Sequence, residues 1–238
     1  MFNPTVTSSS PLLFALEPYQ AMCDYVAGHL QYRDLSLQGD GHAVLVFPGL
    51  GVSGAATADL RMRLQQLGYN VYDWKHGVNI GPGIDFDGWL RLLGDHLREI
   101  YVKHSAPVSL IGWSLGGTYA RELAKKHPVL VRQVITLGTP FGQATGDVQE
   151  HRVGQSAAAT FSPDATLAQR LAEPPPGQSS SIYSQNDGIV NWAQCIGKEA
   201  GEHRNIEVKG VSHYGLVHHP EVLNTVANLL KNLPASES

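Results

Sequence analysis

The sequence of 238 residues has few cysteines and no excess of basic residues. Its two cysteines, Cys23 and Cys195, lie far apart and fit no CxxC or metal-binding spacing. We therefore expect no disulfide framework and predict two buried free thiols. With 17 Lys and Arg against 21 Asp and Glu, the formal net charge is −4. This balance argues against nucleic-acid binding, because the neutralisation of phosphates requires clustered basic side chains.

Long hydrophobic runs are also missing. No stretch approaches the roughly 20 apolar residues of a membrane-spanning helix. No Lys or Arg precedes Arg33, so the N-terminal region lacks the basic start of a signal peptide, and the apolar residues 11–16 are too few for its hydrophobic part. We therefore expect a cytoplasmic protein that is not stably inserted in a membrane.

What the chain does contain is ordinary globular composition, with 42% hydrophobic residues. This is enough apolar material for one sizeable core, and we expect a single domain. Residues 1–11 are rich in Ser, Thr and Pro and are predicted to form a flexible arm. One small cluster of basic residues, between Arg121 and Lys126, alternates with Glu122. We interpret it as the solvent-exposed face of a helix.

Short apolar runs alternate with helical patterns along most of the chain. We predict strands at 43–47, 70–74, 108–113, 131–137, 181–184 and 206–211, and helices at 18–30, 58–67, 89–103, 118–127 and 222–233. The run Ala43–Phe47 is apolar at every position, which is typical of a parallel strand buried on both faces. The alternation predicts an α/β fold with a mainly parallel sheet flanked by helices. Two segments interrupt it: a Gly-rich loop at 77–88, and the polar stretch 142–180, which is either a small cap or a mobile loop.

A G-x-S-x-G pattern follows the predicted strand 108–113. It consists of Gly112, Trp113, Ser114, Leu115 and Gly116, and a helical pattern comes directly after it. Strand–serine–helix is the context of a nucleophile elbow, in which a strained turn exposes the serine hydroxyl. Glycines fit the flanking positions because side chains there would collide across the turn. The alternative is an ordinary Gly-rich turn between a strand and a helix.

A serine hydroxyl needs a base and an orienting acid. Asp187 follows the predicted strand 181–184, and His213 follows 206–211, which gives the chain order Ser, Asp, His. We predict His213 as the base and Asp187 as the carboxylate that orients it. His218 and His219 are alternative bases, and Asp147 is an alternative acid. Taken alone, Asp187 with the following glycine could equally be a simple turn.

Stabilisation of a developing oxyanion requires two backbone N–H donors. The N–H of Leu115 lies at the predicted helix N-terminus. For the second donor we choose Leu50, because Gly49 and Gly51 make the turn after the first strand flexible enough to approach the substrate. The alternative is a turn that only ends the strand.

The substrate pocket is predicted to be apolar. Trp113 and Val52, together with Leu50 and Leu115, would surround the serine with apolar surface, although the same residues could belong to the core. The 11 histidines show no metal-ligand spacing such as HExxH, so we expect no metal and no organic cofactor.

With these residues in place, the chain resembles the α/β-hydrolase superfamily, and more narrowly bacterial serine esterases and lipases. Four blocks between Val44 and Leu230 carry the resemblance: VLVFPGLG, IGWSLGG with YARELAKKHP, VITLGTPFG, and IYSQNDGIV with VSHYGL. The Gly-Thr-Pro turn at 138–140 is identified through the family alone. Many relatives have His-Gly where this chain has Pro48-Gly49, a difference that a backbone donor tolerates.

The resemblance implies hydrolysis of a small-molecule or lipid ester through an acyl-enzyme. We expect soluble or moderately lipophilic esters, because 142–180 lacks the amphipathic character of a lipase lid. Alternatives with the same three residues are a thioesterase, an amidase or an acyltransferase. A C–C hydrolase, a cofactor-free haloperoxidase and a non-catalytic binding protein are more distant alternatives.

Overall fold

A parallel β-sheet forms the centre of the computed structural model, which describes residues 10–30, 38–141, 164–197 and 202–231. The sheet has six strands in the order β2-β1-β3-β4-β5-β6, and every neighbouring pair runs parallel. The strands are β1 (Ala43–Phe47), β2 (Asn70–Asp73), β3 (Val108–Trp113), β4 (Val131–Leu137), β5 (Ser179–Tyr183) and β6 (His203–Glu207). This confirms the parallel α/β architecture predicted from the alternation of strands and helices.

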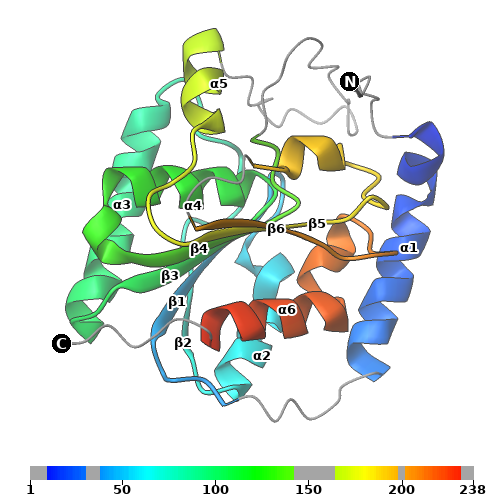
Figure 1. Cartoon of the computed structure of the whole chain (residues 1–238), viewed down its shortest axis with the longest axis horizontal. Coiled ribbons are helices and arrows are strands. Elements are labelled where there is room, and N and C mark those ends of the chain that lie inside the picture. The colour runs from blue at the N-terminus through cyan, green and yellow to red at the C-terminus, as the bar shows by residue number, and fades with distance from the viewer. Residues whose placement is uncertain (1–9, 31–37, 142–163, 198–201, 232–238) are drawn as a thin grey trace.

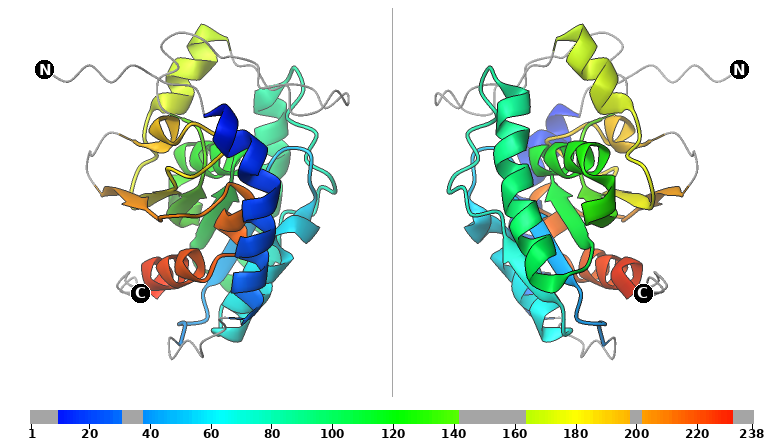
Figure 2. Two further views of the ribbon diagram at one scale, coloured as in Figure 1. Left: turned by 90° about the vertical axis from the view of Figure 1, so that its right-hand side faces the viewer. Right: turned by 90° about the vertical axis from the view of Figure 1, so that its left-hand side faces the viewer.

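Helices cover both faces of the sheet. They are α1 (Pro11–Leu30), α2 (Ala58–Gln66), α3 (Phe86–His104), α4 (Leu115–Lys126), α5 (Ala165–Ala172) and α6 (Pro220–Lys231). Figure 1 shows α3 and α4 on one face and α2 and α6 on the other. Helix α1 belongs to neither layer; it stands beside the loops that follow β5 and β6 (Figures 1 and 2).

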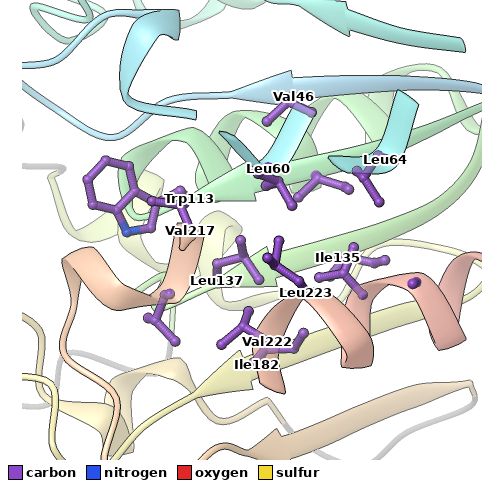
Figure 3. Packing of buried hydrophobic residues seen from close by; sticks show 14 of the residues in the cluster. Val46, Leu60, Leu64, Trp113, Ile135, Leu137, Ile182, Val217, Val222 and Leu223 are labelled. Carbon is purple, nitrogen blue, oxygen red and sulfur yellow. The ribbon is translucent and has the colours of Figure 1, made fainter. Parts of the chain in front are cut away.

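The core is divided between the two faces by the alternation of side chains along each strand. In β1, Leu45 and Phe47 pack towards α3 and α4, whereas Val44 and Val46 pack towards α2 and α6. Figure 3 shows the cluster between the sheet and helices α2 and α6, with Leu60 of α2 close to the strands. Each fully buried side chain of this size contributes about 1.5–3 kcal/mol. An all-apolar strand such as β1 is therefore explained by burial on both faces.

The strand order reverses at β1, which has β2 on one side and β3 on the other. In open parallel sheets, ligands bind outside the carboxyl ends of the strands at such a reversal. The turn after Phe47 and the turn after Trp113 meet at this point. The fold therefore places the predicted oxyanion turn and the predicted nucleophile side by side.

Several element bounds differ from the prediction. Helix α1 begins at Pro11, the last residue of the predicted flexible arm, and continues through Pro18, so it starts seven residues before the predicted helix. Helix α3 begins at Phe86, three residues early, because Asp85 caps it by accepting a hydrogen bond from Gly88 N at 2.7 Å. Helix α6 begins at Pro220, a residue that suits the first helical turn.

Strands β5 and β6 lie upstream of their predicted positions. The early part of β5 is a run of serines, which has no apolar pattern, yet these serines are buried. Hydrogen bonds replace apolar packing there: Thr136 Oγ1 donates to Ser181 Oγ at 3.2 Å, and Ser179 Oγ lies 2.7 Å from His203 Nδ1. The loops that carry Asp187 and His213 are therefore longer than expected.

Arg121 and Glu122 of α4 are buried, so the interpretation of the cluster as a solvated face is wrong for these two residues, whereas Lys126 at the end of the helix is exposed. The guanidinium of Arg121 lies 3.7 Å from the ring centroid of Phe141 and donates to Glu173 O at 2.9 Å. Glu122 contacts Lys125 Nζ at 2.5 Å and Arg170 Nε at 3.1 Å. These contacts fasten α5 and the residues after it to α4. A charge pattern on a helix does not reveal that a later segment covers it.

The stretch 142–180 is only partly described. Residues 142–163 lie outside the described part, α5 follows, and residues 179–180 belong to β5.

Both cysteines are free; Cys195 is buried as predicted, whereas Cys23 is exposed on α1, contrary to the prediction. Among the described helices, none combines the length and the apolar character needed to cross a membrane.

Candidate active site

Ser114 is the single residue between β3 and α4. Its backbone has φ 53° and ψ −126°, a conformation that costs a non-glycine residue about 1–3 kcal/mol. Ser114 N donates to Leu137 O at 2.8 Å, which extends the pairing of β3 with β4 as far as the serine. The helix begins at Leu115 rather than near Thr118, so the turn is tighter than predicted. The serine is partly exposed.

The glycines beside Ser114 are required by close packing. A Cβ on Gly112 would collide with Gly117, and a Cβ on Gly116 would lie 2.5 Å from the carbonyl oxygen of Phe47. The collision at Gly112 confirms the prediction that a side chain there would clash across the turn, whereas Gly116 is required by the end of β1. The second contact also shows that the start of α4 is pressed against the end of β1.

Two further contacts stabilise the strained serine through its carbonyl oxygen. Gly117 N donates to Ser114 O at 2.9 Å, and Thr139 Oγ1 donates to the same oxygen at 2.9 Å. Thr139 is fully buried in the turn after β4. The Gly-Thr-Pro block, identified in the sequence only through the family, therefore has a physical role in supporting Ser114.

Asp187 and His213 form a buried pair. Asp187 Oδ2 lies 2.6 Å from His213 Nδ1, and Oδ1 of the same carboxylate accepts hydrogen bonds from Ile189 N at 2.9 Å and Val190 N at 2.7 Å. The carboxylate thus uses one oxygen to fix its own loop and the other to orient the imidazole. With Nδ1 engaged, Nε2 is the ring nitrogen left to exchange a proton with a substrate or a serine.

The electrostatics of the pair favour a basic histidine. Burial lowers the pKa of His213, but the negative charge of Asp187, the hydrogen bond to it and the charge of Glu17 together outweigh burial and raise the pKa above its ordinary value of 6.5. A histidine that is held in one orientation and made more basic is suited to general-base catalysis.

Trp113 connects the two halves of the site. Its indole Nε1 donates to His213 O at 3.1 Å, and its ring centroid lies 5.4 Å from that of His213. Because Ser114 follows Trp113 directly, these contacts hold the histidine beside the elbow. Gly138 leaves room for the pair, since a Cβ there would lie 3.1 Å from His213 Nδ1 and 3.2 Å from Asp187 Oδ2. Figure 3 shows Trp113 at one end of the core cluster.

The alternative residues are placed elsewhere. His218 Nδ1 lies 3.1 Å from the carboxylate of Asp59 on α2, and His219 Nδ1 accepts a hydrogen bond from Glu221 N at 3.3 Å at the start of α6. Asp147 lies outside the described residues. In the described part of the chain, no group of three or more His, Cys, Asp and Glu side chains is arranged to hold a metal ion.

The predicted oxyanion turn lies close to Ser114. A Cβ on Gly49 would lie 3.2 Å from Ser114 Cβ, and Gly51 has φ 79°, as its assigned flexibility requires. The first N–H groups of a helix have no partner within it, which applies to Leu115 at the start of α4. Leu50 is exposed on the same turn. Val52 is half-buried against the core.

Sequence reasoning missed the residue that holds this turn. Asn79 lies fully buried in the loop before α3, and its Nδ2 donates to Pro48 O at 2.9 Å. Backbone bonds join Gly51 N to Asn79 O and Asn79 N to Val52 O, each at 2.8 Å. Nothing in the sequence distinguishes this asparagine from other polar loop residues. The buried carboxylates Glu17 and Asp24 of α1 were missed for the same reason.

Comparison with known proteins agrees with this geometry. No protein-family model matches the chain. The mouse (Mus musculus) protein named serine hydrolase BPHL is 31% identical over an alignment of 119 residues, and the alignment covers 46% of this chain and 39% of the mouse protein. The chain thus matches less than half of that relative's length.

Similar solved structures cover most of both chains. Bacillus licheniformis lipase BlEst2 has a TM-score of 0.63 at 18% identity, covering 84% of this chain and 95% of its own. A structure of the metagenome-derived lipolytic enzymes LipS and LipT has a TM-score of 0.62 at 16% identity, covering 82% and 96%. Together with the parallel sheet and the serine elbow at its strand-order reversal, these likenesses show that the chain has the α/β-hydrolase fold.

Proposed function

We propose that the protein is a serine hydrolase that cleaves carboxylic esters. In this proposal Ser114 is the nucleophile, His213 the general base and Asp187 the carboxylate that orients it. The observation that carries the proposal is a strained, partly exposed serine whose neighbour Trp113 donates a hydrogen bond to the histidine of a buried His–Asp pair. Such strain persists in folded proteins where the surrounding structure compensates for it, as happens at active sites.

The reaction proceeds in two steps. Ser114 Oγ attacks the ester carbonyl carbon while its proton passes to His213 Nε2, and the N–H groups of Leu50 and Leu115 donate hydrogen bonds to the resulting oxyanion. The imidazolium then protonates the departing alcohol, leaving an acyl group on the serine. Water attacks this acyl-enzyme while its proton passes to His213 Nε2, and the imidazolium then returns that proton to Ser114 Oγ as the carboxylic acid leaves. Asp187 keeps its charge throughout and stabilises the imidazolium.

The acyl group is proposed to be of short or medium length. Leu50, which is exposed on the oxyanion turn, and Val52, which is half-buried two residues later, are the apolar side chains proposed to contact the acyl group. Trp113, which the sequence also suggests as a wall residue, is buried against His213 and acts through that contact instead. Thioesterase and acyltransferase activities would use the same groups. The cytoplasmic location stays a prediction.

A series of p-nitrophenyl esters from acetate to palmitate tests the proposal, with wild type and Ser114→Ala compared at equal concentration. We expect wild type to hydrolyse the shorter esters fastest and the alanine variant to be reduced to the background rate. Absence of hydrolysis across the series in wild type would contradict an esterase. An active Ser114→Ala variant would contradict the nucleophile. Thioester and acyl-acceptor substrates in parallel separate the alternatives.

A further inference from the structure

Helix α1 packs with its acidic side chains inward. Glu17 and Asp24, about two turns apart, are buried, whereas Tyr19 is 65% exposed and Leu12 and Met22 are similarly exposed. An ordinary surface helix buries its apolar stripe and exposes its charges. Burial of a carboxylate costs free energy unless hydrogen bonds offset it. The partners of these two carboxylates therefore indicate what the helix does.

Glu17 bridges the two loops that carry the acid and the base. Its Oε2 accepts a hydrogen bond from Gly188 N at 2.9 Å, and its Oε1 accepts one from Tyr214 N at 3.1 Å. Gly188 is the residue after Asp187, and Tyr214 is the residue after His213. One carboxylate on a separate helix thus fixes the spacing between the backbones of both residues. Use of both oxygens as acceptors is the pattern of an ionised carboxylate.

Asp24 holds the histidine loop from a second point. Its Oδ2 accepts hydrogen bonds from Ser212 N at 2.9 Å and from Ser212 Oγ at 2.6 Å. The same hydroxyl accepts a hydrogen bond from Gly215 N at 2.9 Å. His213 therefore lies in a short segment whose backbone is bound to α1 on both sides, through Ser212 before it and Tyr214 after it.

Glycines lie where α1 presses on the two loops. A Cβ on Gly188 would collide with Leu13 O and would lie 2.9 Å from Glu17 Oε2. A Cβ on Gly215 would collide with the carboxylate of Asp24. The glycine after Asp187, which alone suggests only a turn, is thus explained by the close approach of a helix from the other end of the chain.

We propose that Glu17 and Asp24 are positioning residues of the active site and that α1 is a clamp that holds the base and its orienting acid in place. This inference rests on the proposed function, since the clamp acts only through Asp187 and His213. It explains why the helix presents carboxylates to the protein rather than its apolar residues. Loss of the clamp would misplace the reacting groups, and small misplacements cost large factors in rate.

The charge of Glu17 gives the clamp a second effect. The groups that bear on the ionisation of His213 are Asp187 and Glu17, and both carboxylates raise the pKa of the imidazole. Burial raises the pKa of Glu17 itself, with repulsion from Asp187 in the same direction. Cys195, also near Asp187, remains neutral because burial raises its thiol pKa well above 9.0. Neutralising Glu17 should therefore lower the pKa of His213.

The test compares wild type, Glu17→Gln and a control, Tyr19→Ala, which changes an exposed side chain on the same helix. For each, kcat and KM per fluorophosphonate-titrated site, the pH dependence of kcat/KM, and Tm are measured. We expect kcat of Glu17→Gln to fall by about tenfold to a hundredfold with KM within about twofold, because positioning is lost rather than binding. The acid limb of the kcat/KM profile of Glu17→Gln should move to lower pH. The control, Tyr19→Ala, should match wild type in all of these measurements.

A purely structural role for Glu17 predicts a lower Tm with no movement of the acid limb, and this result would overturn the proposal. Wild-type kcat in Glu17→Gln would also overturn it. A second variant, Gly188→Ala, pushes α1 away while Glu17 keeps its charge, and should lower kcat with a smaller movement of the acid limb than in Glu17→Gln; full kcat there contradicts a clamp. Ser114→Ala in the same assay keeps the two questions separate, because its activity tests the nucleophile alone.

Discussion

A serine lies near each end of strand β3, Ser109 within the strand and Ser114 directly after it, and a contacting His–Asp pair lies towards each end. At the amino end, Ser109 Oγ lies 2.8 Å from His42 Nε2, and His42 Nδ1 contacts the carboxylate of Asp40. Gln133 Nε2 also contacts this hydroxyl, at 3.5 Å. The order of hydrogen bonds is that of a catalytic triad, yet the proposed nucleophile is Ser114, at the other end of the strand.

The two serines differ in exposure and in backbone conformation. Ser109 is 0% exposed and lies within β3, so no substrate can reach it. Ser114 is partly exposed and has a positive φ on a turn that opens at the carboxyl edge of the sheet. The hydroxyl of Ser109 is already engaged inside the protein, whereas Ser114 uses only its backbone groups to hold its turn.

The two histidines differ in the direction of their pKa shifts. Burial dominates at His42 and lowers its pKa despite the hydrogen bond to Asp40. At His213, the charge of Asp187 and the additional charge of Glu17 outweigh burial and raise the pKa. A Ser–His–Asp arrangement is therefore not sufficient to define a catalytic site; access, strain and a favourable field must accompany it.

The largest expected contrast comes from removing each histidine. His213→Ala should lower kcat by about 10⁶-fold, because a serine without its base is hardly more reactive than an alcohol in water. His42→Ala should leave kcat per titrated site within about threefold. Steady-state kinetics with p-nitrophenyl butyrate measures both. Equal losses in the two variants would remove the distinction between the sites.

The acids give the next contrast. Asp187→Asn should reduce kcat by about 10⁴-fold, since the amide favours the wrong tautomer of His213. Asp40→Asn changes a half-exposed carboxylate at the opposite edge of the sheet and should leave turnover unchanged. The same assay applies, and a normal rate in Asp187→Asn would show that another carboxylate orients the base.

For the buried serine, substitution should lower the stability of the protein and leave its activity unchanged. Ser109→Ala leaves buried His42 without a partner for Nε2, which should lower the free energy of unfolding by about 1–3 kcal/mol and Tm by several degrees. Its activity per titrated site should remain that of wild type. Thermal unfolding followed by circular dichroism measures Tm for the variant and wild type. An unchanged Tm would mean that the hydrogen bond between Ser109 and His42 makes no net contribution to the free energy of unfolding.

The smallest effects are those of pH. The acid limb of kcat/KM should lie above pH 6.5, because His213 must be neutral to act as a base and its pKa is raised.

The pH dependence of stability distinguishes the two histidines as well. The contribution of His213 to stability is present below pH 6.5 and is lost as pH rises through its raised folded-state pKa. For His42, whose folded-state pKa is lowered, stability is present above pH 6.5 and is lost as pH falls through the lowered value. Unfolding of His213→Gln and His42→Gln across pH separates these opposite slopes.

The sequence predicts the nucleophile side of the site better than the acid–base side. A strand, Gly112, Ser114 and a helix follow each other within a few residues, so a local pattern contains the whole elbow. The His–Asp side depends on Glu17, whose hydrogen bonds reach residues 171 and 197 positions away. From sequence alone, a carboxylate in an otherwise apolar helix is expected to be exposed to solvent. Only the folded structure shows that it is buried and which N–H groups bind it. The same limit applies to Arg121, which α5 covers.

The most direct test of the central claim is to identify the serine that reacts. Wild type is labelled with a fluorophosphonate, digested, and the modified peptide sequenced by mass spectrometry, with heat-denatured protein as the control for nonspecific labelling. We expect one adduct, on Ser114, that is absent from His213→Ala and retained in His42→Ala. An adduct on Ser109, or labelling of Ser114 that persists without His213, would contradict it.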